Sequence, residues 1–399
     1  MSAGGKHGSR SLGLAGKIVI AILAGVLIGF ASAKCGYSGD VLMRILKTFN
    51  VFFAQVLRFI VPVLILGLVT PAIADAGRGA GRLLVSVMVF SYVSTCVAAA
   101  FGYVMSGTLL PHYIAKGAFA AVGNGKAFVP FVDLKIAPVC DVLTALALAF
   151  MVGVGIVLTN ATAVKRGVDE FAGIVKLAIE KAIIPGLPVY IMTMIAELTA
   201  SGKIGAMAGT MFKVIGTGWA LTLVFLVLLY SLAGLVSGKN PVKALYNMLP
   251  AYLTALSIAS SAAVIPVTLD CCERNGISRD IRNFVVPLCA NVHMVGSAIK
   301  LMASSYAVTI IYGIDLSASQ VVHFTLMFAI AAVAAPGVMS GVLMASLGFV
   351  ESIFGFTADQ IAVMMTFYMA LDGYGPAANV TGDGAIAMLA DRLFGARRQ

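Results

Sequence analysis

Charged residues are scarce in this sequence. Only 11% of the 399 residues are Asp, Glu, Lys or Arg, whereas about a quarter of residues are charged in a soluble domain. Stretches without any such residue reach or exceed the roughly 20 residues that cross the hydrocarbon layer of a membrane. These stretches are Leu83 to Pro111, Val214 to Gly238, Ala244 to Leu269 and Leu316 to Val350. The scarcity of charge excludes a soluble globular domain and predicts a polytopic membrane protein.

The net charge is +10, but the sequence lacks any basic patch interleaved with aromatic residues. Binding to nucleic acid is therefore excluded as the reason for this charge. The basic residues stand instead at the ends of apolar segments, in alternate connections. By the positive-inside rule these connections face the cytoplasm, so we expect a multi-pass protein of the cytoplasmic (inner) membrane with both termini inside. The residues concerned are Lys6, Arg10, Lys17, Arg78, Arg82, Lys165, Arg166, Lys239, Lys243, Arg274, Arg279, Arg282, Arg392, Arg397 and Arg398.

The six cysteines show no paired spacing of the zinc or redox kind. No His or Cys stands near a serine at a spacing typical of a nucleophile and its base. We therefore expect core cysteines and no enzyme. The run from Ile18 to Ala33 imitates a signal peptide, but the many further apolar segments favour a retained first helix.

The first half of the chain predicts simple spans. Their apolar lengths place helices at about 12–33, 45–74, 83–108, 120–159, 168–200 and 208–237. In the second half, the long apolar stretches are interrupted. Ser260, Ser261 and Pro266 break the first, and Pro336, Gly337 and Gly341 break the second. We expect each stretch to form two half-helices that meet at a tip.

A helix with an interruption of its own follows each of these pairs. The interruptions are predicted at Val292 to Ser297 and at Asp372 to Asp383. Corresponding broken segments in two repeats are typical of a transporter site at the membrane midplane, because unwound backbone offers carbonyls to cations and helix N-termini offer N–H groups to anions.

Four residues of the last helix carry the most informative pattern. Asp372, Pro376, Asn379 and Asp383 follow one another at spacings of four, three and four, which places them on one face. Carboxylates inside a membrane cost several kcal/mol unless they are paired, so this face predicts a functional site. Ser297 adds a neutral hydrogen-bonding group.

These residues resemble the dicarboxylate/amino acid:cation symporter family, which includes glutamate transporters and the bacterial serine/threonine symporter. The resemblance covers most of the chain. It is carried by Ser260-Ser261 ahead of Ile265-Pro266-Val267-Thr268, by Asn379-Val380-Thr381-Gly382-Asp383, and by His293-Met294-Val295-Gly296-Ser297 in the place of the family's Asn-Met-Asp-Gly-Thr.

The resemblance implies an all-α fold of eight spanning helices and two re-entrant hairpins, a homotrimer and an elevator mechanism, with the tip at Pro336 to Gly341 as the extracellular gate. It also implies a division of the chain. Scaffold helices 1 and 2 lie in 1–82, transport-domain helix 3 in 83–115, scaffold helices 4 and 5 in 116–205, and the remaining transport domain in 206–399.

Carried over residue by residue, the resemblance implies that Asp372 holds a substrate ammonium, while Asn379 and the Ser260-Ser261 tip bind its carboxylate. The implied substrate-binding residues are Ser260, Ser261, Ser297, Gly337, Asp372, Gly375 and Asn379. For coupled Na⁺, Asp383 with Asn379 and carbonyls around Ala290 and His293 would form one site. Met294 and the tip around Val333 to Gly337 would contribute to a second.

Two departures from the family pattern bear on the substrate and the cation. Gly375 stands where glutamate and aspartate transporters have an arginine, which favours a small neutral amino acid such as serine, threonine or alanine. Val295 replaces the aspartate of a third sodium site, although Ser94 and Thr95 of that site are present.

Two residues keep alternatives open. His293 stands in place of an asparagine and, because imidazole titrates near neutrality, is a candidate carrier of a coupling proton. Lys300, one turn beyond Ser297, is a candidate replacement for the arginine that would attract acidic amino acids or dicarboxylates. An ion channel is a further alternative, since broken helices also build pores.

Overall fold

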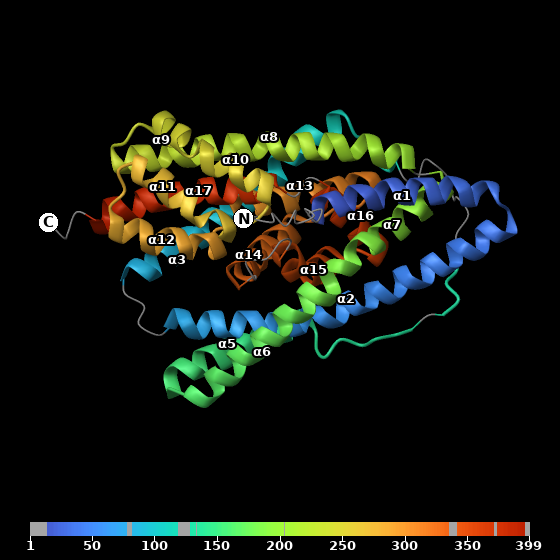
Figure 1. Cartoon of the computed structure of the whole chain (residues 1–399), viewed down its shortest axis with the longest axis horizontal. Coiled ribbons are helices and arrows are strands. Elements are labelled where there is room, and N and C mark those ends of the chain that lie inside the picture. Colours follow the sequence, from blue (N-terminus) through green and yellow to red (C-terminus); the bar gives the residue numbers. More distant parts are fainter. Residues whose placement is uncertain are drawn as a thin grey trace, which may run out of the picture.

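The structure is a computed structural model that describes residues 14–77, 82–118, 128–132, 134–202, 204–334, 341–370 and 373–395. All the regular elements of these residues are helices (Figure 1). They are α1 Leu14–Lys34, α2 Tyr37–Gly77, α3 Arg82–Leu109, η1 Leu110–His112, α5 Val142–Thr159, α6 Thr162–Ala178, η2 Ile179–Ile183, α7 Ile184–Ala200, α8 Ile204–Ser237, α9 Pro241–Asn247, α10 Leu249–Ile258, η3 Ala262–Val264, α11 Ile265–Arg274, α12 Arg279–Val292, α13 Val295–Tyr312, α14 Ala318–Ala334, α15 Gly341–Phe354, α16 Ala358–Met369 and α17 Tyr374–Phe394.

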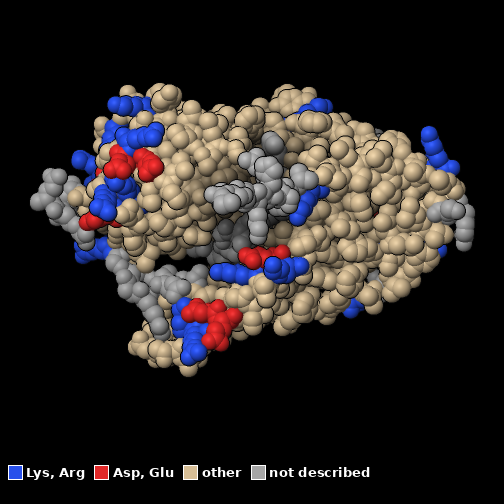
Figure 2. Space-filling view, in the orientation of Figure 1, with Lys and Arg blue, Asp and Glu red and all other residues tan. Residues whose placement is uncertain are grey.

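Within the described ranges, six helical segments are long and apolar enough to cross a membrane. They are Gly16–Lys34, Gly39–Pro71, Arg82–His112, Thr162–Ala200, Met207–Ser237 and Arg279–Tyr312. Large apolar side chains on their surfaces face outward, including Leu27 and Leu235, which are 71% and 83% exposed. Figure 2 shows a face that is mostly free of Lys, Arg, Asp and Glu. Such a surface suits hydrocarbon and not water.

The start of the helix predicted at 120–159 is wrong in the residues that the structure describes. α5 begins only at Val142, and residues 134–138 are not helical. Proline lacks the backbone N–H and disfavours helix at the residue before it, and Pro138 stands in this segment. Asp141 then starts the helix as its N-cap, because its side chain accepts a hydrogen bond from the Thr144 N–H at 2.9 Å.

The span predicted at 168–200 begins earlier and is not a regular α-helix. The chain is helical from Thr162 to Ala200, but it passes through a π-turn at Ile179–Ile183. Pro188 lies inside α7. Because proline removes a helical hydrogen bond, the regular α-helical ladder is interrupted along this span.

The first long apolar stretch of the second half is interrupted as predicted. α10 and α11 pack against each other, and Ala259 between them has a left-handed φ of 56°. α14 and α15 also pack together, while the tip at 335–340 lies outside the described residues.

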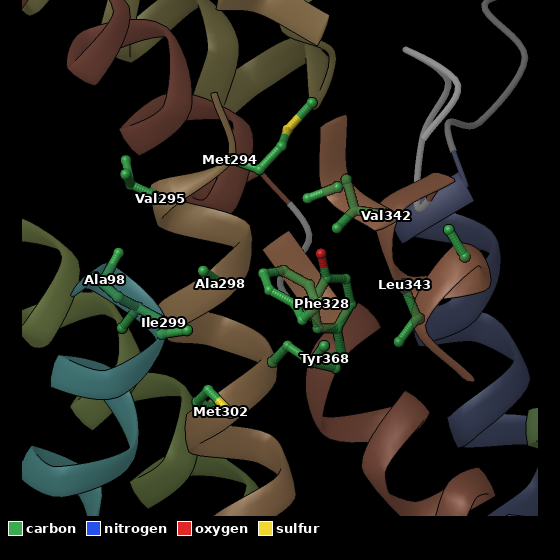
Figure 3. Close-up of a cluster of buried hydrophobic side chains, with 14 of the residues drawn as sticks. Ala98, Met294, Val295, Ala298, Ile299, Met302, Phe328, Val342, Leu343 and Tyr368 are labelled. Carbon is green, nitrogen blue, oxygen red and sulfur yellow. The ribbon is translucent and has the colours of Figure 1, made fainter. Parts of the chain in front are cut away.

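The described helices pack mainly in two groups. α2 packs against α1, α5, α6 and α7, while α13 packs against α3, α8, α16 and α17. In Figure 1, α2, α5 and α6 lie along one side of the molecule and α8 along the other. Every residue of α13 from Val295 to Ser305 is buried. Figure 3 shows its Ala298, Ile299 and Met302 inside the apolar cluster, which makes α13 the central helix around which the site is built.

Candidate functional site

The break between α12 and α13 exposes the first backbone N–H groups of α13, which have no acceptor within their own helix. No local side chain caps them. Asn379 of α17 supplies the acceptor, since its Oδ1 accepts from the N–H of Gly296 at 2.8 Å and of Ser297 at 3.2 Å. A side chain of the last helix therefore fixes where α13 begins.

The amide nitrogen of Asn379 completes this junction. It donates to Ser297 Oγ at 3.0 Å and lies 3.2 Å from the Met294 sulfur. The Met294 N–H in turn donates to Thr95 Oγ1 of α3 at 3.3 Å. Three helices thus meet at a polar cluster inside the apolar core.

Glycine makes this close meeting of α13 and α17 possible. A Cβ added to Gly296 would lie 2.4 Å from the Gly375 carbonyl oxygen and 2.6 Å from Ala378 Cβ. Neither distance is tolerated between real atoms, so the crossing depends on the missing side chain.

His293 connects the break to the second carboxylate of the predicted face. Its Nδ1 lies 3.0 Å from Asp383 Oδ1, and its Nε2 lies 3.1 Å from Ser94 Oγ. His293 and Asp383 are completely buried. A neutral imidazole has one donor and one acceptor nitrogen, so with an ionised Asp383 the Nδ1–H donates to the carboxylate and Nε2 accepts from the serine hydroxyl.

Ser94, His293 and Asp383 form a hydrogen-bonded trio that no sequence spacing predicts. Ser94 and His293 are far apart in sequence and meet only because α3 packs against α12 and α13. Sequence spacing could not reveal the contact, although the residue types match those of a catalytic triad.

One atom of the site is suited to a cation. Asp383 Oδ2 is buried and has no hydrogen-bond partner among the residues that the structure describes. A buried carboxylate oxygen without a donor is costly, and a hard cation prefers such a ligand. Ala290, predicted to add a carbonyl, is buried on α12 one turn ahead of Met294. The described part of the chain holds no cluster of three or more His, Cys, Asp or Glu that could bind a metal.

The predicted hairpin tip lies between α10 and α11. Ser261 is buried, and Ser260 Oγ accepts from the Ala263 N–H at 3.4 Å. α10 packs along α17, and Gly373 approaches it so closely that an added Cβ would lie 2.0 Å from the Leu256 carbonyl oxygen. This contact holds the first half-helix against the start of α17.

Lys300 lies beside Gly375 in the same core. It is completely buried, and its Nζ lies 4.0 Å from the ring centroid of Tyr368 and 5.1 Å from that of Tyr374. A Cβ added to Gly375 would lie 3.4 Å from Lys300 Cδ and 3.6 Å from Ser297 Oγ. These are ordinary van der Waals distances, so Gly375 lies directly against the lysine stem and the Ser297 side chain.

The structure brings together Ser297, Asn379, His293, Met294 and Asp383 from the predicted set. Gly337 and Asp372 lie outside the described residues. The predicted interruption from Asp372 to Asp383 is placed too late, because α17 is continuous from Tyr374 to Phe394.

Sequence reasoning missed Tyr368 and Tyr374. They stand six positions apart, on either side of the break between α16 and α17, so no helical spacing links them. An aromatic residue on each side of a break next to a buried lysine is a signal that only the packing reveals.

Comparisons with known proteins identify the family and several relatives of this chain. The model of the sodium:dicarboxylate symporter family matches residues 14–393. The serine/threonine transporter SstT of Streptococcus suis is 27% identical over 84% of this chain and 94% of its own length, and that of Streptococcus thermophilus is 26% identical over 82% of each. Excitatory amino acid transporter 3 of Mus musculus is 33% identical over 41% of this chain and 30% of its own length.

Proposed function

The chain belongs to the sodium:dicarboxylate symporter family, and from that premise we propose that it carries a small amino acid or carboxylate across the membrane together with a cation. Family and relatives are transporters, so the protein is a multi-pass membrane transporter and not an enzyme. The junction of α13 and α17 is the proposed site.

The observation that carries the proposal is the capping of broken α13 by Asn379. Broken helices inside a membrane are tolerated only where protein or a site satisfies their backbone. Here the acceptor for the N–H groups of α13 comes from α17. Both helices lie beside the same polar cluster. Closure around a ligand at this junction would act on both helices together.

Sodium is the proposed coupling cation. Asp383 Oδ2, with its unfulfilled acceptor capacity, is the anchor of the cation, and the backbone around Ala290 and His293 supplies further oxygen ligands. The alternative is a proton carried by His293, which is supported by its two hydrogen bonds to Asp383 and Ser94.

For the mechanism we propose that binding of the cation changes the affinity for the substrate, and that binding of the substrate changes the affinity for the cation by the same factor. Closure of the second hairpin then commits the loaded part to move as an elevator. The packing of α2 mainly against α1, α5, α6 and α7, and of α13 mainly against α3, α8, α16 and α17, supports a fixed scaffold and a moving part. A homotrimer in the cytoplasmic membrane, with both termini in the cytoplasm, completes the proposal.

The first candidate substrate is a small neutral amino acid such as serine, threonine or alanine. Gly375 adds no charge to the site, and two relatives that cover most of the chain are named serine/threonine transporters. The second candidate is an acidic amino acid or dicarboxylate, which is favoured by the buried ammonium of Lys300 beside Gly375.

Thermal stabilisation of the purified protein tests the proposal, since a ligand that binds only the folded state raises its apparent stability. We expect at least one compound from a panel of neutral and acidic amino acids and dicarboxylates to raise the unfolding temperature in sodium, and to do so less in potassium. No stabilisation by any of these compounds, with either cation and at any pH from 5.5 to 8, would contradict a symporter of this class.

A further inference from the structure

A groove on the outer surface of the molecule runs between α3 and α14. It has a volume of about 610 Å³, and its walls are almost entirely apolar. The opposite sides of the two helices face the core, where Ala98 and Phe328 lie in the buried cluster (Figure 3). Val97, Val104 and Val322 line the groove and are more than half exposed. The groove therefore opens toward the surroundings of the protein, which in a membrane are lipid tails.

A second, polar pocket continues this groove at the end of α3. Tyr103 and Leu316 line both cavities. The second pocket has a volume of about 320 Å³, and Lys116 and Asp315 are among its lining residues. From Cys96 to its end, α3 rises about 20 Å, which is long enough for one leaflet of the hydrocarbon layer, roughly 15 Å thick. An acyl chain in the groove would thus place its headgroup at the polar pocket.

The two charges of the polar pocket have opposite signs. Nζ of Lys116 lies 2.7 Å and 3.0 Å from the two carboxylate oxygens of Asp315, and the two side chains are 62% and 85% exposed. An ion pair so exposed adds little stability, so a ligand can open it at small cost. The ligand that suits both partners carries a phosphate for the lysine ammonium and an ammonium for the carboxylate.

Headgroup chemistry decides which lipid the groove prefers. A lipid tail has apolar surroundings both in the bilayer and in the groove, so its burial gives no preference among lipids with the same tails. A purely anionic headgroup would be repelled by Asp315. A primary ammonium donates hydrogen bonds to the carboxylate, whereas a quaternary ammonium has no N–H to donate.

We propose that the groove between α3 and α14 and the adjoining pocket hold one phospholipid of the phosphatidylethanolamine type. An acyl chain lies along Val97 and Val322, the phosphate contacts Lys116, and the ammonium contacts Asp315. The lipid adds a contact between α3 and α14, which already pack together. None of the described residues that line the two cavities belongs to the proposed substrate and cation site, so this lipid site is a feature beyond the proposed function.

Native mass spectrometry of the purified full chain tests the assignment. After removal of bound lipid in detergent, the protein is titrated with phosphatidylethanolamine, phosphatidylcholine and phosphatidylglycerol that have the same acyl chains. Asp315→Lys makes both charges of the pocket positive, and the double variant Lys116→Asp, Asp315→Lys exchanges them. Glu170→Lys is the matched control, because Glu170 forms a similarly exposed pair with Arg166 on α6.

We expect the wild type and the Glu170 variant to bind phosphatidylethanolamine about tenfold more tightly than the other two lipids, as one additional charge-assisted hydrogen bond does. Asp315→Lys should lose this preference and bind phosphatidylglycerol most tightly. The double variant should regain the preference for phosphatidylethanolamine, because both charges are present again. Ala100→Phe places a ring in the groove and should weaken binding of all three lipids.

Equal affinity of the wild type for the three lipids would overturn the proposal, since lipid would then surround the protein without selection. A preference for phosphatidylethanolamine that survives Asp315→Lys would overturn it as well, because the headgroup would then bind elsewhere. All the substituted side chains are exposed, so we expect the variants to fold, and thermal unfolding without lipid verifies it. If Asp315→Lys does not fold, the order of the three lipids on the wild type and the loss of binding in Ala100→Phe decide.

Discussion

Nδ1 of His293 lies 3.0 Å from Oδ1 of Asp383, and both side chains are completely buried. The contact joins the break after α12 to the middle of α17. It leaves the other carboxylate oxygen, Oδ2, without a partner among the described residues. Asp383 is thus fixed by one oxygen and available to a cation through the other.

Replacement of Asp383 should separate cation coupling from folding. In Asp383→Asn the side-chain oxygen still accepts a hydrogen bond, but the negative charge is gone, so we expect cation-dependent uptake to fall to background. The unfolding temperature should change little, since a neutral hydrogen bond of about 1 kcal/mol is retained. Uptake in proteoliposomes and thermal unfolding measure the two effects. Sodium-driven uptake at the wild-type rate would remove Asp383 from the cation site.

Removal of the Asn379 side chain should destabilise the junction of the two broken helices. Asn379→Ala leaves the N–H groups of Gly296 and Ser297 without their acceptor, at a cost of about 1–3 kcal/mol for a buried unsatisfied group. The wild type keeps this acceptor, so Asn379→Ala should unfold at a lower temperature than the wild type does. An unchanged unfolding temperature would contradict the capping role.

A methyl group at Gly296 should be poorly tolerated. Its Cβ would lie 2.4 Å from the Gly375 carbonyl oxygen, so Gly296→Ala should force α13 and α17 apart and cost about 1–3 kcal/mol. Gly209→Ala in α8 is the matched control, because its Cβ would have no neighbour within 4 Å. Equal unfolding temperatures of the two variants would show that the close crossing is not essential.

Lys47 connects the two groups of packed helices. Its Nζ lies 3.0 Å from Glu197 Oε2 of α7 and 3.3 Å from Asp359 Oδ1 of α16. The Glu197 side chain is 24% exposed and that of Asp359 is 61% exposed. Because exposed ion pairs contribute about 0–1 kcal/mol, Asp359→Asn should change the unfolding temperature less than Glu197→Gln does. A larger effect of Asp359→Asn would show that the contact with α16 is the stronger one.

The sequence predicted the features that depend on local chemistry. Apolar length located α1, α3 and α8, and proline and small polar residues located the break between α10 and α11. The break between α12 and α13 was placed at Val292 to Ser297. The start of α5 was missed, because the prediction followed apolar length, whereas Pro138 and the N-cap Asp141 set the start of the helix. The contacts of Asn379 with Gly296 and of His293 with Ser94 join segments about 80 and 200 residues apart. Only tertiary packing produces them, and no spacing rule applies.

Uptake by proteoliposomes under an inward sodium gradient is the most direct test of cation-coupled symport through this site. With serine, aspartate and succinate as separate labelled substrates, we predict accumulation of at least one of them above its external concentration, which disappears when the gradient is collapsed and in Asp383→Asn. A substrate that only equilibrates, at a rate independent of any sodium or proton gradient, would contradict the account.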